Sequence, residues 1–147
     1  MKNRHSIVCA AYLLLVKDNK ILLLRRFNTG YEDGKYSLPA GHVDEGESIE
    51  GCLIKEAKEE IGISVARENL ELKHVMHRKA TDYNGERLDF FFSCTSWKGE
   101  IKNMEPDKCD DLSWFEIDEL PDNLIFYVQT AIINSLVDNK IYSGLHW

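Results

Sequence analysis

Three glutamates within residues 41–63 carry the clearest chemical signal in this sequence. At about 100° of rotation per residue, a helix over residues 47–61 places Glu56, Glu59 and Glu60 within an arc of roughly 100°. Like charges four residues apart destabilise a helix unless something neutralises them. A divalent cation such as Mg²⁺ or Mn²⁺ can do so, because hard metal ions prefer carboxylate oxygens and commonly share them with substrate phosphates. The spacing therefore predicts a metal site.

An ordinary surface helix is the alternative, because Glu is a favourable helix residue. The flanking residues favour the metal site. Residues 41–63 read GHVDEGESIEGCLIKEAKEEIGI, which resembles the Nudix box, GX5EX7REUXEEXGU with U aliphatic. Every fixed position matches except one, since Lys55 stands where the family has Arg. In addition, Ala57 is a small occupant of a position that usually holds a larger aliphatic residue.

The resemblance extends more loosely from the first predicted strand to the last predicted helix, and it implies a fold and an activity. The implied fold is the α/β Nudix fold, a mixed β-sheet sandwiched between α-helices. The implied activity is Mg²⁺- or Mn²⁺-dependent hydrolysis of nucleoside diphosphate-linked substrates. We expect a single domain over residues 1–147, because this length is typical of one domain. In its small size the chain resembles MutT-type nucleoside triphosphate pyrophosphohydrolases, which release nucleoside monophosphate and pyrophosphate.

Three other functions stay open at this point. The first is an ADP-ribose or sugar-nucleotide pyrophosphatase. The second is a non-catalytic Nudix-fold module that binds a nucleotide, for which we would expect the loss of a box glutamate, and none is lost. The third is a generic acidic interaction domain. That domain would show no effect of divalent metal on thermal stability, whereas a metal site raises the melting temperature by mass action.

The resemblance also assigns roles to residues of the box. It implies that Glu56, Glu59 and Glu60 hold the metal, together with the carbonyl oxygen of Ala40, where the family usually has Gly. Glu56 is expected to take the proton from the attacking water. The arginine of the motif usually orients a catalytic glutamate. Lys55 keeps its charge but lacks its planar fork, so we expect weaker support.

A further acid is expected from the acidic loop over residues 103–111. Nudix enzymes often take one more carboxylate from such a loop, as metal ligand or base. Asp110 is the preferred residue because it lies just ahead of a predicted strand, and Glu105 and Asp111 rank behind it. The alternative for each acid is a solvated loop position.

Substrate contacts are predicted at two places outside the box. Arg25 and Arg26 end the second strand, either as an ordinary charged strand end or as a phosphate or base contact, because the arginine fork suits both. Asn123 is either an N-cap or, by resemblance to MutT-type enzymes, a nucleobase contact. In the tail, Tyr142 and Trp147 either cover the core or stack on a base, and we favour the core.

The elements that position these residues follow from apolar patterns. Apolar runs between turn residues predict strands over residues 6–16, 21–26, 70–79, 87–97 and 112–115. Apolar residues at helical spacing predict helices over 47–61, ended by Gly62, and over 124–136. Asn84 and Gly85 predict a hairpin turn. Residues 88–95 alternate in a way that gives their strand one core face and one mixed face.

Composition excludes several classes of protein. The net charge of −7 argues against binding a nucleic acid polymer, which requires a basic surface. No apolar run approaches the length that crosses a membrane. The basic and apolar start of the chain is interpreted as a strand, because the turn at residues 17–20 follows it. Four cysteines without metal-ligand spacing fit reduced thiols. We expect a cytoplasmic monomer or homodimer that binds a small nucleotide.

Overall fold

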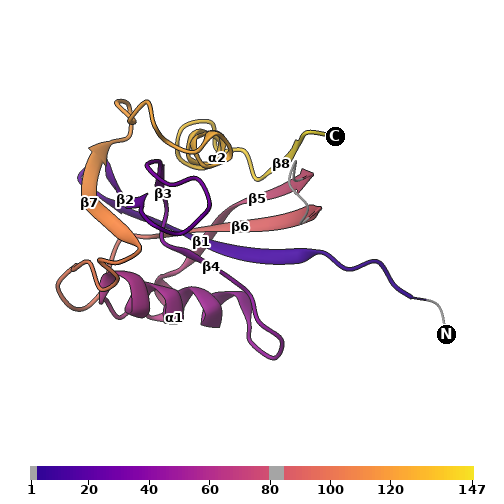
Figure 1. Cartoon of the computed structure of the whole chain (residues 1–147), viewed down its shortest axis with the longest axis horizontal. Helices are drawn as coiled ribbons and strands as arrows, with labels where there is room; N and C mark the ends of the chain where they lie inside the picture. Colours follow the sequence, from indigo (N-terminus) through magenta and orange to yellow (C-terminus); the bar gives the residue numbers. More distant parts are fainter. Residues whose placement is uncertain (1–2, 80–84) are drawn as a thin grey trace.

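A mixed β-sheet lies between two helices in the computed structural model, which describes residues 3–79 and 85–147 (Figure 1). The strands are β1 (Val8–Lys17), β2 (Lys20–Arg26), β3 (Tyr36–Ser37), β4 (Ala40–His42), β5 (Glu71–Lys79), β6 (Glu86–Cys94), β7 (Cys109–Glu116) and β8 (Tyr142–Leu145). The helices are α1 (Ile49–Ile61) and α2 (Phe126–Leu136), with a short 3-10 turn, η1 (Arg67–Asn69). The predicted α/β architecture is confirmed.

The sheet divides at β1, which joins two groups of strands (Figure 1). The strand order is β3-β2-β1-β6-β5-β8, with β4 also pairing with β1 and β7 with β2. β1 runs parallel to β6 along most of its length, but it pairs with β2 only beside their connecting turn, at Val16 and Lys17. Further along, β4 pairs with β1 over residues 10–12. β1 and β2 therefore diverge, and β4 enters between them.

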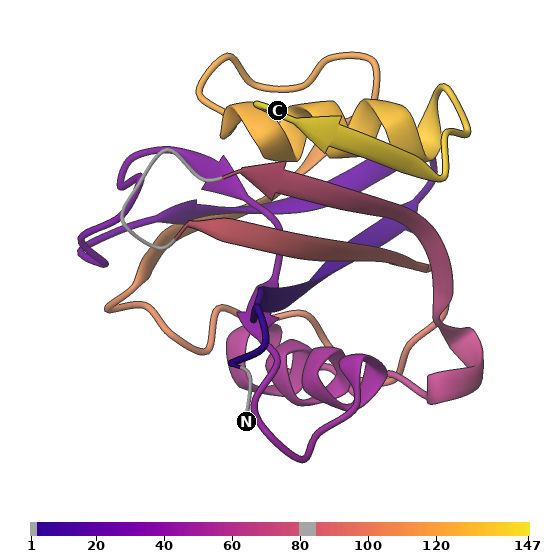
Figure 2. The ribbon, with the colours of Figure 1, turned by 90° about the vertical axis from the view of Figure 1, so that its right-hand side faces the viewer.

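Both faces of the sheet are covered, α2 lying on one side and α1 on the other (Figures 1 and 2). Under α2 the core includes Tyr12 and Phe91, whose rings stack with centroids 4.6 Å apart. Under α1 it includes Leu13 and Leu53. We predicted one core face and one mixed face on β6. The mixed face is in fact the more buried, with Asp89 and Phe91 fully inaccessible, because α2 covers it.

The two ends of α1 have local causes in the sequence. The Ser48 hydroxyl accepts a hydrogen bond from the Gly51 amide at 2.9 Å, which caps the first turn. Gly62 ends the helix as predicted, with a φ of 76° that favours glycine. The helix begins at Ile49, two residues after the predicted start. Glu47 lies outside it because the N-cap Ser48 has an extended backbone, and the Glu47 side chain accepts the backbone N–H of Asp44.

The C-terminal tail differs from its prediction. It forms β8, parallel to β5, and Leu145 packs against the core, whereas Tyr142 and Trp147, the residues predicted to cover the core, are exposed. Trp147 is 63% exposed, and its ring packs 4.5 Å from that of His77, whose carbonyl accepts its indole N–H at 2.9 Å. Tyr142 is also exposed. The predicted pairing of β5 with β6 is confirmed, although Asn84 of the predicted turn lies outside the described residues.

Two simpler expectations concern membrane spans and thiols. Within residues 3–79 and 85–147, neither helix has the length and hydrophobicity needed to cross a membrane. All four cysteines are free thiols, and three of them are buried. Burial raises the pKa of Cys52 to about 12, which disfavours its reactive thiolate.

Candidate active site

Two adjoining cavities open where β1 and β2 diverge. The larger, of about 520 Å³, is lined from eight elements and the loop after β2, by residues that include Tyr12, Arg26, Tyr31, Ala40, Gly41, His42, Glu60, Arg78, Arg87 and Tyr127. The smaller, of about 360 Å³, is lined by Leu24, Arg26, Asn28, Thr29, Glu60, Glu105, Lys108 and Cys109. Glu60 and Arg26 belong to both linings, so an acidic and a basic side chain lie at the junction of the two cavities.

Glu60 projects from the last turn of α1 toward β4. Its carboxylate oxygens accept the backbone N–H of Ala40 at 3.1 and 3.4 Å. Burial raises the pKa of Glu60 well above its usual value, and the carboxylates of Glu56 and Glu105 add to this effect, while the Ala40 N–H opposes it. The positive charge near Glu60 is therefore too small to offset the effects of burial and of the neighbouring carboxylates.

Glu56 lies directly against the backbone of Gly41. A Cβ built on Gly41 would stand 2.5 Å from Cγ, Cδ and Oε1 of Glu56, so only glycine leaves room for this carboxylate. Burial, followed by the charge of Glu59, raises the pKa of Glu56. Glu59 itself is exposed. The structure thus brings Glu56 and Glu60 together on the inner side of α1 and leaves Glu59 at its outer edge.

The donor set fits a hard divalent cation. Among the described residues, no three Asp, Glu, His or Cys side chains converge tightly enough to hold an ion as they stand. Glu56, Glu60 and Glu105 nevertheless influence one another electrostatically, and a cation would relieve the repulsion that raises the first two pKa values. The oxygen chemistry of these side chains and of the Ala40 carbonyl suits Mg²⁺ or Mn²⁺.

The acid that the loop supplies to this cluster is Glu105. The loop folds back onto the end of α1, because the Lys102 and Met104 amides donate to the Ile61 and Glu60 carbonyls at 3.0 and 3.1 Å. These bonds carry Glu105 into the smaller cavity. Asp110, the preferred residue from sequence, instead binds Arg25 through a 2.7 Å hydrogen bond.

The two adjacent arginines at the end of β2 point to different surroundings. Arg26 lines both cavities, and its Nε donates to the Tyr31 carbonyl at 2.7 Å. Arg25 is paired with Asp110 and lies over the ring of Tyr36, 5.7 Å from its centroid. Successive strand residues face opposite sides. Only Arg26 is therefore placed to meet a ligand in the cavities.

Asn123 lies outside the residues that line either cavity. Its side-chain Nδ2 donates to the Gly34 backbone carbonyl at 3.0 Å. The backbone carbonyl of Asn123 accepts the Tyr36 N–H at 2.9 Å. The interpretation of Asn123 as an N-cap is wrong, because α2 begins only at Phe126. Asn123 instead fastens the loop that follows β2.

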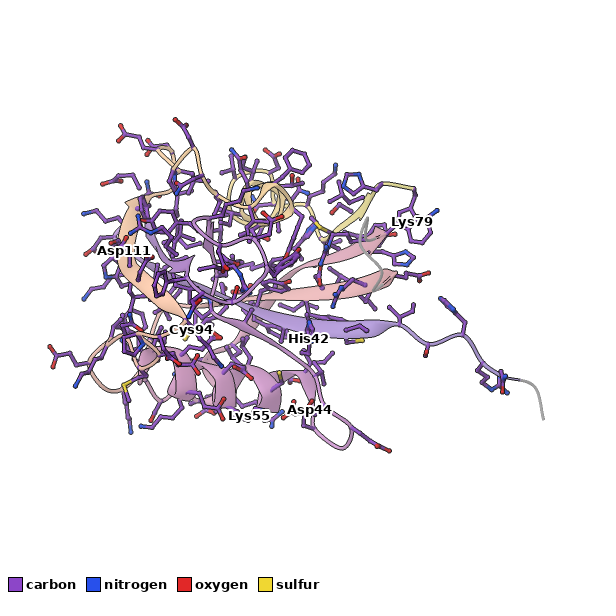
Figure 3. The ribbon with its side chains drawn as sticks, in the orientation of Figure 1. His42, Asp44, Lys55, Lys79, Cys94 and Asp111 are labelled. Carbon is purple, nitrogen blue, oxygen red and sulfur yellow. The ribbon has the colours of Figure 1, made fainter. Side chains whose placement is uncertain are left out.

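Lys55 contacts the loop before α1 and not the buried glutamates. Its Nζ lies 3.1 Å from the Glu47 carboxylate and 3.5 Å from the Asp44 carboxylate. Lys55 and Asp44 are labelled in Figure 3. The hydrogen bond to Glu47 is the main reason that the pKa of Lys55 rises to about 12. The box residue at this position therefore braces the loop that leads into α1.

A buried basic group at the β5–β6 side of the larger cavity was missed by the sequence analysis. Arg78 Nε donates to Asp89 at 3.0 Å, and its guanidinium lies 3.7 Å from the ring centroid of Tyr127. Arg87 Nη1 lies 3.1 Å from His42 Nε2. The signal in the sequence is that Arg87 and Asp89, two residues apart, place charges on the mixed face of a strand.

Taken together, the mixed sheet, its two covering helices and the glutamates of α1 define an α/β protein with the Nudix fold. A model of the NUDIX domain matches residues 5–131. The chain belongs to the Nudix family.

Three relatives illustrate the range of the family around this chain. The NAD-capped RNA hydrolase NudC of Pseudomonas aeruginosa is 32% identical over 126 residues, which span 86% of this chain and 41% of that protein. The ADP-ribose pyrophosphatase of Methanocaldococcus jannaschii is 32% identical over 108 residues, 74% of this chain and 61% of that protein. The crystal structure of a MutT NUDIX hydrolase from Burkholderia pseudomallei superposes with a TM-score of 0.81 at 27% identity, covering 90% of this chain and all of that one.

Proposed function

We propose that the protein is a divalent-metal-dependent pyrophosphohydrolase that cleaves a phosphoric anhydride in nucleoside diphosphate-linked substrates. One observation carries the proposal: Glu60 and Arg26 line the junction of two cavities, with Glu105 and Lys108 in one of them. Phosphate oxygens require positive charge, and hydrolysis also needs a base for the attacking water. Carboxylates beside cationic side chains supply both requirements.

The roles proposed for Glu56 and Glu60 follow from their surroundings, and the role proposed for exposed Glu59 follows from its place in the Nudix box. Glu56, Glu59, Glu60 and the Ala40 carbonyl would hold Mg²⁺ or Mn²⁺, which when bound neutralises phosphate charge and acidifies water. Glu56, held against Gly41, accepts the proton from the attacking water. Its raised pKa suits a base that works near neutral pH.

The loop and strand residues complete the proposed site. Glu105 replaces Asp110 as the second candidate base, because it alone of the two lines a cavity with Glu60. Arg26 and Lys108 bind the oxygens of the diphosphate, where the planar fork of arginine allows paired hydrogen bonds. Lys55 is a positioning residue that acts through the loop before α1.

Nucleoside triphosphates are the first candidate substrates, with nucleoside monophosphate and pyrophosphate as products. Support comes from the likeness to the MutT NUDIX hydrolase along its entire length. ADP-ribose and other dinucleotide-type substrates are the second candidates, because the relatives named for them reach 32% identity. The retention of every box glutamate supports turnover over mere binding.

A substrate panel tests the proposal. Canonical and oxidised nucleoside triphosphates, ADP-ribose, NAD⁺, sugar nucleotides and dinucleoside polyphosphates are incubated with Mg²⁺ or Mn²⁺, and the products are separated. Glu59→Gln and Glu60→Gln are expected to lower kcat by at least about a hundredfold while the protein stays folded. Glu68→Gln on exposed η1 is the matched control. Near-normal turnover in both test variants would contradict the proposed metal ligands.

A further inference from the structure

The larger cavity has a second polar feature in addition to Glu60. Arg78 and Arg87 stand opposite each other in the register of β5 and β6, and both line the cavity. They are only 7% and 8% exposed, and Asp89 beside them is fully buried. His42, labelled in Figure 3, reaches the same place from β4. We call Arg78, Arg87 and His42 the basic recess.

Charge in the basic recess is not balanced by the residues that the structure describes. Two guanidinium groups share one carboxylate, and that carboxylate binds Arg78. In the described part of the chain, Arg87 Nε and Asp89 Oδ1 are both buried without a hydrogen-bond partner, and Arg87 forms no ion pair there. Its Nη1 meets His42, which carries no compensating charge. The two nitrogens are 3.1 Å apart.

A buried cation with an unsatisfied N–H destabilises a protein unless an anion completes its environment. The guanidinium fork matches an oxyanion, because two parallel N–H donors meet two oxygens. Arg78 is already held in place, since its guanidinium lies over the ring of Tyr127 and its Nε donates to Asp89. The free donor of Arg87 therefore belongs to a preorganised anion site rather than to a mobile surface residue.

We infer that the basic recess binds a phosphate or carboxylate carried by the substrate in addition to the diphosphate that is cleaved. This inference rests on the proposed function, because Glu60, Arg26 and the basic recess line one cavity. A substrate with that extra anion leaves no buried guanidinium donor unsatisfied. The favoured class is therefore a nucleoside diphosphate linked to, or bearing, a further acidic group.

Two matched pairs of compounds test the inference. UDP-glucuronate differs from UDP-glucose by a carboxylate, and NADP⁺ differs from NAD⁺ by a phosphate. In at least one pair, the member with the extra anion is expected to show a kcat/KM at least tenfold higher than the member without it, and the responding pair identifies the type of anion. Arg87→Met should reduce that ratio to about 1, whereas Arg87→Lys should retain part of it. Arg67→Met, which changes an exposed arginine on η1, should leave the ratio intact.

Calorimetry on the metal-free protein separates failure of the inference from failure of the proposed function. The same pairs are titrated without turnover, and the member with the extra anion should bind at least tenfold more tightly to the wild type but not to Arg87→Met. That result supports the basic recess even if no compound is hydrolysed, which would refute only the proposed function. Equal affinities within both pairs would overturn the inference.

Discussion

The contact between Gly41 and Glu56 leads to a specific prediction for Gly41→Ala. The added Cβ would stand 2.5 Å from three side-chain atoms of Glu56. Ordinary contact between such atoms requires about 3.5 Å, so the carboxylate must move by roughly 1 Å. The end of a glutamate side chain can make this movement. The variant therefore displaces the proposed base without disrupting the fold.

The two effects of Gly41→Ala differ in size. A 1 Å misplacement of a catalytic group costs about a hundredfold in rate, which corresponds to about 2.7 kcal/mol of activation free energy. The stability change is smaller. A strained rotamer costs about 0.5–1.5 kcal/mol, and the loss of a glycine from the unfolded chain returns about 0.4–1 kcal/mol. The melting temperature should therefore shift by no more than about 4 °C.

A double-mutant cycle assigns this loss to Glu56. Steady-state kinetics at saturating Mg²⁺ are measured for the wild type, Gly41→Ala, Glu56→Ala and the double variant. If Gly41 acts through the carboxylate, adding Gly41→Ala to Glu56→Ala costs little further activity. Gly144→Ala on β8 is the matched control, because its Cβ would meet no atom closer than 3.4 Å. Wild-type kcat/KM in Gly41→Ala, or full additivity in the cycle, would refute the reasoning.

Two further predictions concern the other acids of the site. Glu105→Gln should lower kcat by at least about tenfold while Asp110→Asn stays within about threefold, because only Glu105 shares a cavity with Glu60; equal losses in the two variants would contradict this assignment. Glu60→Gln should raise the melting temperature of the metal-free protein at pH 7.5 but not at pH 4. Burial raises the pKa of Glu60, so its ionised form destabilises the fold only above the unfolded-state pKa of about 4.3, and increasingly so as pH rises. Melting curves in EDTA at both pH values check this, and an equal or lower melting temperature at pH 7.5 would count against it.

The helix that carries the site could be predicted from sequence because its signals are local. Ser48 and Gly62 mark its ends, and helical spacing alone places Glu56 and Glu60 on one side. The strands β3, β4 and β8 were not predicted, since runs of two to four residues show no measurable alternation. They form because neighbouring strands offer free backbone groups, and that information lies elsewhere in the chain.

The loop acid and the basic recess depend on long-range contacts. Glu105 and Asp110 lie in one acidic loop, and sequence position favoured Asp110. Two backbone hydrogen bonds to the end of α1 bring Glu105 beside Glu60, and for this reason we propose Glu105 ahead of Asp110. Similarly, Arg78 and Arg87 flank a predicted turn, where charged residues are ordinary. Only the covering helix α2 reveals that both are buried.

The attachment of Asn123 to Gly34 has an evolutionary consequence. Residues 27–34 form a rim whose base is closed by hydrogen bonds between Arg26 and the Gly34 and Lys35 backbone, in addition to the Asn123 contact. Insertions or deletions at its tip would leave the reactive carboxylates undisturbed. Selection can therefore change the length and sequence of this rim, and with them the compounds that are admitted, while the proposed catalytic residues stay the same.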